Sequence, residues 1–168
     1  MGTDIHACIE YRRRKGSERV DERWLSWGSD NVRIGRDYEL FGALSGQRKR
    51  REFQELIPAR GIPDDLGDVA FHKHHEPILE NGRSMEVMTY VRPNETRVER
   101  GTMLYVKDDQ ESVAGHGYSY LTLEEIHRCL EHAGLELHHR DFDFQVVVAT
   151  MEKLNEEYET RLVFWYDC

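Results

Sequence analysis

The sequence predicts a single α+β domain with a mainly antiparallel sheet, in which the first and last strands are adjacent and central and two or three helices cover the sheet. Three observations support this prediction. The chain opens on alternating polar and apolar residues, closes on an apolar run at 161–168, and holds segments of helical period between them. We find no linker, internal repeat or low-complexity tract, so residues 1–168 are expected to form one domain.

The first strand alternates strictly in side-chain character. Its apolar positions are Ile5, Ala7, Ile9 and Tyr11, and its polar positions are Asp4, His6, Cys8 and Glu10. A period of two is typical of a strand that rests one face on a core. After a charged turn, residues 23–27 predict a second strand that pairs back as a hairpin.

Two helices carry clear end signals. Residues 37–45 predict a short helix, with Asp37 as its N-cap and Gly46 as its terminator. A second helix begins at Thr122, which forms a capping-box pattern with Glu125, and it ends at Gly134.

The middle of the chain is less regular. Residues 57–65 are dense in Pro and Gly and predict a loop of fixed shape. Asp64 or Asp65, at the end of this loop, is expected to cap a short helix that reaches Phe71. The histidines that follow favour an exposed polar loop over a metal site; they are His72, His74 and His75. Residues 84–91 and 96–107 have strand character and predict a hairpin.

The last third of the chain predicts one more helix and the final strand. Apolar residues recur at helical spacing from 141 to about 159, which indicates a long amphipathic helix. The apolar run at 161–168 is typical of a strand buried on both faces, and the first strand is its natural neighbour.

Composition bears on three questions: whether the protein binds nucleic acid, whether its cysteines are oxidised and where it is located. The formal net charge of −9 argues against binding to duplex nucleic acid, because that needs a clustered positive field. The three cysteines form no CxxC pair, which favours reduced thiols. The sequence shows neither an apolar run behind a basic start nor a stretch long enough to span a membrane, so we expect a cytosolic protein with no membrane partner.

Several polar groups are expected to converge on the polar face of the first strand. The catalytic candidates are Asp4, His6 and His116, and the ligand-binding candidates are Arg36, Arg48, Arg60, Ser119 and Asp167. Two histidines and an orienting carboxylate suit general acid/base work, and arginine forks match phosphate oxygens. This set predicts a small, anionic, phosphorylated ligand.

Several candidates also have a structural interpretation. Asp4 and His6 suit a structural hydrogen-bonded pair, Arg60 a brace for its loop, and Ser119 a local capping residue. No cofactor follows firmly from the sequence. A divalent metal held by Asp4, His6 and His116 is an open alternative, since these residue types suit Zn or Mn.

Five blocks of the sequence stand out: M-G-T-D-I-H at 1–6, R-D-Y-E-L-F-G-A-L-S-G-Q-R at 36–48, P-A-R-G-I-P-D-D at 58–65, H-G-Y-S-Y-L-T-L-E-E at 116–125 and R-L-V-F-W-Y-D at 161–167. Together they resemble a widespread family of uncharacterised proteins from tailed phages and prophages. The blocks occur in the order of the family. Residues 66–112, which include the expected hairpin, have no counterpart there and are interpreted as a variable insert.

The resemblance implies a phage setting, in the cytoplasm of an infected bacterium. By analogy with small accessory phage proteins, we expect a counter-defence protein that binds, and as an enzyme would cleave, a phosphorylated nucleotide-type signal through His6 and His116. Such an enzyme would be a phosphodiesterase or related hydrolase. The alternatives are a sponge that holds the ligand unchanged and a protein that inhibits a host defence enzyme. A homo-oligomer is also compatible with the sequence.

Overall fold

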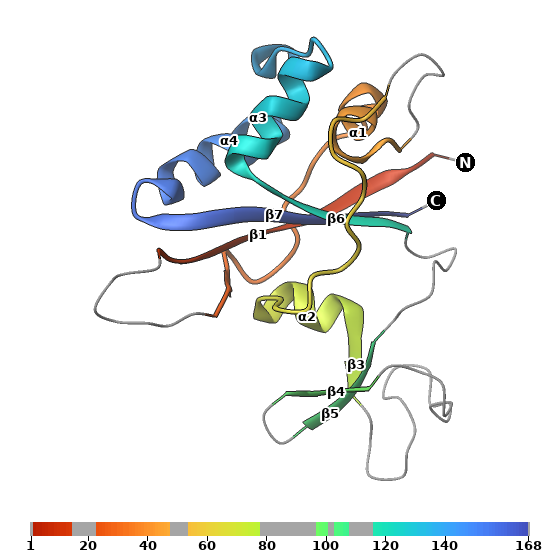
Figure 1. Cartoon of the computed structure of the whole chain (residues 1–168), viewed down its shortest axis with the longest axis vertical. Helices are drawn as coiled ribbons and strands as arrows, with labels where there is room; N and C mark the ends of the chain where they lie inside the picture. Colours follow the sequence, from red (N-terminus) through yellow and green to blue (C-terminus); the bar gives the residue numbers. More distant parts are fainter. Residues whose placement is uncertain are drawn as a thin grey trace.

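The protein is built on a four-stranded antiparallel sheet with strand order β2–β1–β7–β6 (Figure 1). The computed structural model describes residues 2–14, 23–47, 54–77, 97–100, 103–107 and 116–167. The strands of this sheet are β1 (Asp4–Arg13), β2 (Leu25–Ser26), β6 (His116–Thr122) and β7 (Tyr158–Asp167). Because β1 pairs with β7 along its full length, the predicted α+β fold with adjacent, central terminal strands is confirmed.

Three helices cover one face of this sheet (Figure 1). They are α1 (Tyr38–Ser45), α3 (Leu123–His132) and α4 (Phe142–Asn155). The apolar side of β1 packs into the large core between helices and sheet, where Ala7 and Ile9 are almost fully buried. The alternation in β1 therefore places its apolar side on the face that α1, α3 and α4 cover.

A fourth helix, α2 (Asp68–His74), lies on the opposite face of the sheet (Figure 1). It packs Ala70 and Phe71 against Cys8 of β1 and Trp165 of β7 in a second apolar cluster. The polar side of the first strand is therefore covered in its middle and open only towards its ends. The N- and C-termini lie side by side at one edge of the molecule, where β1 begins and β7 ends (Figure 1).

The predicted capping residues of α1 and α3 are confirmed. Asp37 accepts from the backbone of Glu39 and Leu40, and Gly46 takes the left-handed conformation with φ 74°. Thr122 and Glu125 form the expected capping box. The prediction that Asp64 or Asp65 caps α2 is wrong: Gly67 is the N-cap residue.

The last helix is shorter than the periodicity suggested. It ends at Asn155, and β7 begins at Tyr158, three residues before the predicted start of the final strand. The apolar residues near 158 suit a helix or a strand equally well. The strand extends because the end of β1 offers it partners: Arg12 Nε donates to Glu159 Oε2 over 2.8 Å.

A smaller antiparallel sheet has the strand order β3–β5–β4, from β3 (His75–Pro77), β4 (Arg97–Arg100) and β5 (Met103–Lys107). Residues 96–107, predicted as one strand, thus hold two strands that pair with each other. The other predicted strand, 84–91, lies outside the described residues. The exposed-loop interpretation of the histidines is wrong at His74 and His75, which are buried. None of the described helices is long and apolar enough to cross a membrane.

Candidate functional site

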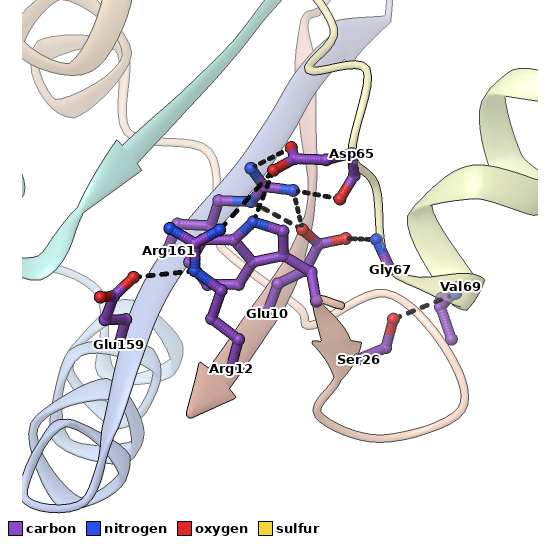
Figure 2. A network of polar contacts seen from close by, with 9 residues as sticks. Glu10, Arg12, Ser26, Asp65, Gly67, Val69, Glu159 and Arg161 are labelled. Atoms are coloured by element: carbon purple, nitrogen blue, oxygen red, sulfur yellow. Dashed lines mark hydrogen bonds and ion pairs between the residues drawn. The ribbon is translucent and has the colours of Figure 1, made fainter. Parts of the chain in front are cut away.

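A buried ion network joins β1, β7 and the loop before α2 (Figure 2). Arg161 donates from Nε to Glu10 Oε2 over 2.8 Å and from Nη1 to Asp65 Oδ1 over 2.7 Å. Its Nη2 reaches the Asp65 carbonyl at 2.9 Å, and the Gly67 N–H donates to Glu10 Oε1 at 2.7 Å. The Glu10 side chain has no exposed surface and that of Arg161 is 5% exposed, whereas the Asp65 side chain is 60% exposed, so the network ties three segments together with its Glu10–Arg161 pair shielded from water.

Trp24 completes this network with its ring. Its Nε1–H donates to Asp65 Oδ2 over 3.0 Å. The guanidinium carbons of Arg161 and Arg12 lie 4.1 and 4.4 Å from the indole centroid, within cation–π range. Burial raises the pKa of the Glu10 carboxyl, and the charge and hydrogen bond of Arg161 offset part of that effect.

A hollow of about 500 Å³ opens beside the network. It lies where β6 ends at Thr122, opposite Arg161, and the chain turns into α3. Arg12 and Arg14 line it together with the aromatic rings of Trp24 and Tyr120 and the first turn of α3. Arg14 also donates to the backbone carbonyl of Asn155, which bounds the hollow from the end of α4. Asp65, Glu124 and Glu159 line it too, so the hollow combines arginines, carboxylates and aromatic rings.

His6 sits at the other end of the same face, close to the chain termini. Its Nε2 lies 2.8 Å from Asp167 Oδ2, and its Nδ1 lies 3.5 Å from the Asn31 amide nitrogen. The ring stacks on Trp165, with centroids 5.6 Å apart and planes 17° from parallel. The contacts fit a tautomer in which Nε2–H donates to the carboxylate. Asp167 thus orients His6, as the strand pairing of Asp4 with Asp167 allows.

Asp4 does not take the role that the sequence suggested for it. Its carboxylate forms a two-pronged ion pair with Arg36, whose Nη2 donates to Oδ2 over 2.7 Å and whose Nε donates to Oδ1. The hydrogen bond from Arg36 holds the pKa of Asp4 below its ordinary value. The prediction that Asp4 orients His6 is therefore corrected: Asp4 holds Arg36.

His116 lies on the opposite face of the sheet from His6. It pairs with Tyr166, a residue of the helix-covered core, whereas His6 pairs with Trp165, the next residue of β7. Successive residues of a strand point to opposite faces. A register shift between His116 and Ser119 contributes to this placement. The structure therefore does not bring the two proposed acid/base histidines together.

The remaining candidates take structural contacts. Arg60 donates from Nη1 and Nη2 to the two Glu125 carboxylate oxygens, at 3.0 and 2.5 Å, and its backbone N–H donates to Ser119 Oγ at 3.2 Å. Both residues thus brace the loop that precedes α2 against β6 and α3. Arg48 lies outside the described residues.

The metal alternative at Asp4, His6 and His116 does not fit the geometry. The histidines lie on opposite faces, and Arg36 occupies both carboxylate oxygens of Asp4. Within the described ranges, three candidate ligand atoms approach within 4.8 Å of one another elsewhere, at Glu136, His138 and His139.

Sequence reasoning missed the network and the hollow. The sequence places Glu10 on the polar face of one strand and Arg161 at the start of an apolar run, and it predicts no partner for either. The signal that could have found them is the pairing of the first and last strands, because opposite charges across a strand pair stabilise it. For Asp65 the sequence pattern predicts only a helix cap.

Comparisons with known proteins add no assignment. No family model, curated protein or solved structure matches the chain.

We predict that the contribution of Asp65 to the stability of the protein depends on pH. Partial burial alone would raise the pKa of Asp65, but the hydrogen bond and charge of Arg161 and the Trp24 N–H outweigh it and hold that pKa below its ordinary 3.8. A carboxyl whose pKa is lower in the folded than in the unfolded state stabilises the fold fully at pH values above its unfolded-state pKa. This stabilisation is lost as the pH falls through the folded-state pKa. The stability advantage of the wild type over Asp65→Asn should be full at pH 6 and shrink below about pH 4.

Thermal unfolding of both proteins between pH 2.5 and pH 6 measures this difference. A constant difference in Tm across that range would show that the Asp65 charge contributes nothing to the network.

Proposed function

We propose that this chain is a phage counter-defence protein that binds a phosphorylated, nucleotide-type signal and holds it unchanged in the infected bacterium. The resemblance of five sequence blocks to the phage family supports the setting. The observation that carries the binding function is the hollow, in which two arginines, two aromatic rings and the start of a helix meet.

The hollow suits a ligand of nucleotide size and chemistry. Sites for small molecules typically enclose about 300–1,000 Å³, and about 500 Å³ lies within that range. The half-buried Tyr120 offers part of its ring to a base, while Arg12 and Arg14 stand two residues apart and can contact a phosphate from one side. The start of α3 adds little to this contact, because Thr122 already caps the Glu125 N–H and Glu124 and Glu125 carry negative charge in the first turn.

Charge within the hollow favours a ligand that carries neutral as well as anionic parts. Arg12 is paired with Glu159, and Arg161 with Glu10 and Asp65, so much of the local positive charge is already balanced. Arg14 is exposed and donates to a backbone carbonyl, which adds no negative charge. We therefore expect Arg14 to make the main contact with phosphate.

Sequestration is favoured over cleavage because the histidines lie elsewhere. The described residues that line the hollow include no histidine. His6 and His116 lie on opposite faces of the sheet, so they offer no acid/base pair to one phosphodiester. Phosphodiesterase activity is the competing outcome of the experiment below.

Binding is tested by calorimetry with a panel of cyclic mononucleotides, cyclic dinucleotides and ADP-ribose. We expect at least one of them to bind with 1:1 stoichiometry, and Arg14→Ala to weaken it at least tenfold, as loss of a charge-assisted hydrogen bond implies. Arg33→Ala is the matched control, since Arg33 is 90% exposed and pairs with Asp143 away from the hollow. Equal affinity in the two variants, or no binding by the wild type, would refute the proposal.

The state of the ligand after binding separates sponge from enzyme. Intact ligand recovered from the denatured complex supports sequestration, whereas products that disappear in His6→Ala support cleavage.

An inhibitor of a host defence enzyme is the second candidate. Arg36 and Arg60 are both paired with carboxylates, and the chain carries a net charge of −9, which suits an acidic surface facing a basic partner. Stoichiometric co-purification of one host protein, with no nucleotide binding, would favour this function.

A further inference from the structure

We propose that Glu136, His138 and His139 form a binding site for a divalent transition-metal ion of the Zn²⁺ class. The three residues lie in the connection between α3 and α4, on and just before the short 3₁₀ helix Leu137–His139. One ligand atom from each lies within 4.8 Å of the other two. This site is independent of the hollow, which lies at the opposite ends of α3 and α4.

The distances match the edges of a tetrahedral zinc site. Glu136 Oε2 lies 3.3 Å from His138 Nε2 and 3.4 Å from His139 Nδ1. Two atoms bonded to one tetrahedral Zn²⁺ at about 2.0–2.1 Å lie about 3.3–3.4 Å apart. The Glu136 oxygen is therefore spaced from each imidazole as two ligands of one ion are, and the three ligand atoms all lie within 4.8 Å of one another.

The backbone holds these side chains in place. The His139 and Arg140 N–H groups donate to the carbonyls of Glu136 and Leu137, at 3.1 and 3.0 Å. Gln145 Nε2 donates from α4 to the Arg140 carbonyl at 2.8 Å. Leu137 packs against the large core. A segment fixed in this way loses less conformational entropy when its side chains bind an ion.

The donor set selects the kind of ion. Two imidazoles and one carboxylate suit Zn²⁺, Ni²⁺ or Cu²⁺, whereas Mg²⁺ and Ca²⁺ take oxygen ligands. All three side chains are 64–70% exposed, so the remaining coordination position opens to solvent. Three ligands with an open position describe an exchangeable site rather than a closed structural one.

The test is titration of the chelator-treated full-length chain with Zn²⁺ at neutral pH, followed by calorimetry. We expect the His138→Ala/His139→Ala variant to bind one equivalent of zinc fewer than the wild type. The Glu136→Gln variant should bind the same equivalent with an affinity at least tenfold lower. Co²⁺ in place of Zn²⁺ should give the wild type visible absorption of tetrahedral type, absent from the double variant.

His127→Ala is the matched control. His127 Nε2 lies 3.4 Å from Glu152 Oε1, so it makes the same kind of exposed His–Glu contact without a second imidazole in that pair. Zinc binding should not change in this variant, and circular dichroism should show all variants folded. The proposal is overturned if the wild type binds no zinc, if the double variant binds as the wild type does, or if His127→Ala loses the same equivalent.

Discussion

Replacing Arg161 with leucine is expected to lower the free energy of unfolding by about 3–5 kcal/mol, because it leaves the Glu10 carboxylate buried without its cation. Arg161 contacts Glu10, Asp65 and the Trp24 ring, and its side chain is 5% exposed. The loss is large because water cannot replace the missing partner of Glu10, which has no exposed surface.

Urea denaturation of the wild type and Arg161→Leu measures this loss. Arg33→Leu is the control, since it removes the same charge from a 90% exposed side chain and should change stability by less than about 0.5 kcal/mol. The double variant Glu10→Leu/Arg161→Leu should recover much of the loss, because no charge then stays buried without a partner. Equal effects of the two single variants would show that water reaches Glu10.

The parts of the fold that the sequence predicts well are those set by local chemistry. Asp37 and Thr122 cap helices because a short oxygen-bearing side chain reaches the free N–H groups of the first turn. The alternation of the first strand and the apolar run of the last place both inside one sheet. The end of α4 was missed because Tyr158 suits either period, and only pairing with β1 decides between them.

The candidate site was harder to predict because it depends on register. Sequence reasoning identified histidines and arginines of suitable chemistry but not their partners. A shift of one residue moves a side chain to the other face of a sheet, and the irregularity between His116 and Ser119 leaves His116 opposite Tyr166. The same limit hid the contact of Glu10 with Arg161, which lie 151 positions apart in the chain.

Phe144→Ala should destabilise the protein by about 3–5 kcal/mol, whereas Phe142→Ala should change its stability by less than about 0.5 kcal/mol. Both residues lie in the first turn of α4, two positions apart. Phe144 is fully buried in the large core, and Phe142 is 73% exposed. The two substitutions remove the same atoms from the same helix, so the difference between them isolates burial from helix propensity.

Urea denaturation of the two variants, with equal m-values, would establish that difference. The helical period alone places Phe144 on a stripe with Val147, Val148 and Met151, all of which are buried with it. If Phe142→Ala destabilised the protein as much as Phe144→Ala, the exposed face of α4 would have to be buried against another molecule in solution. Val146, which is 46% exposed and lies one turn along the helix, would belong to the same buried surface. The pair of variants therefore tests at once how α4 packs on the sheet and whether its outer face is an interface with a second copy.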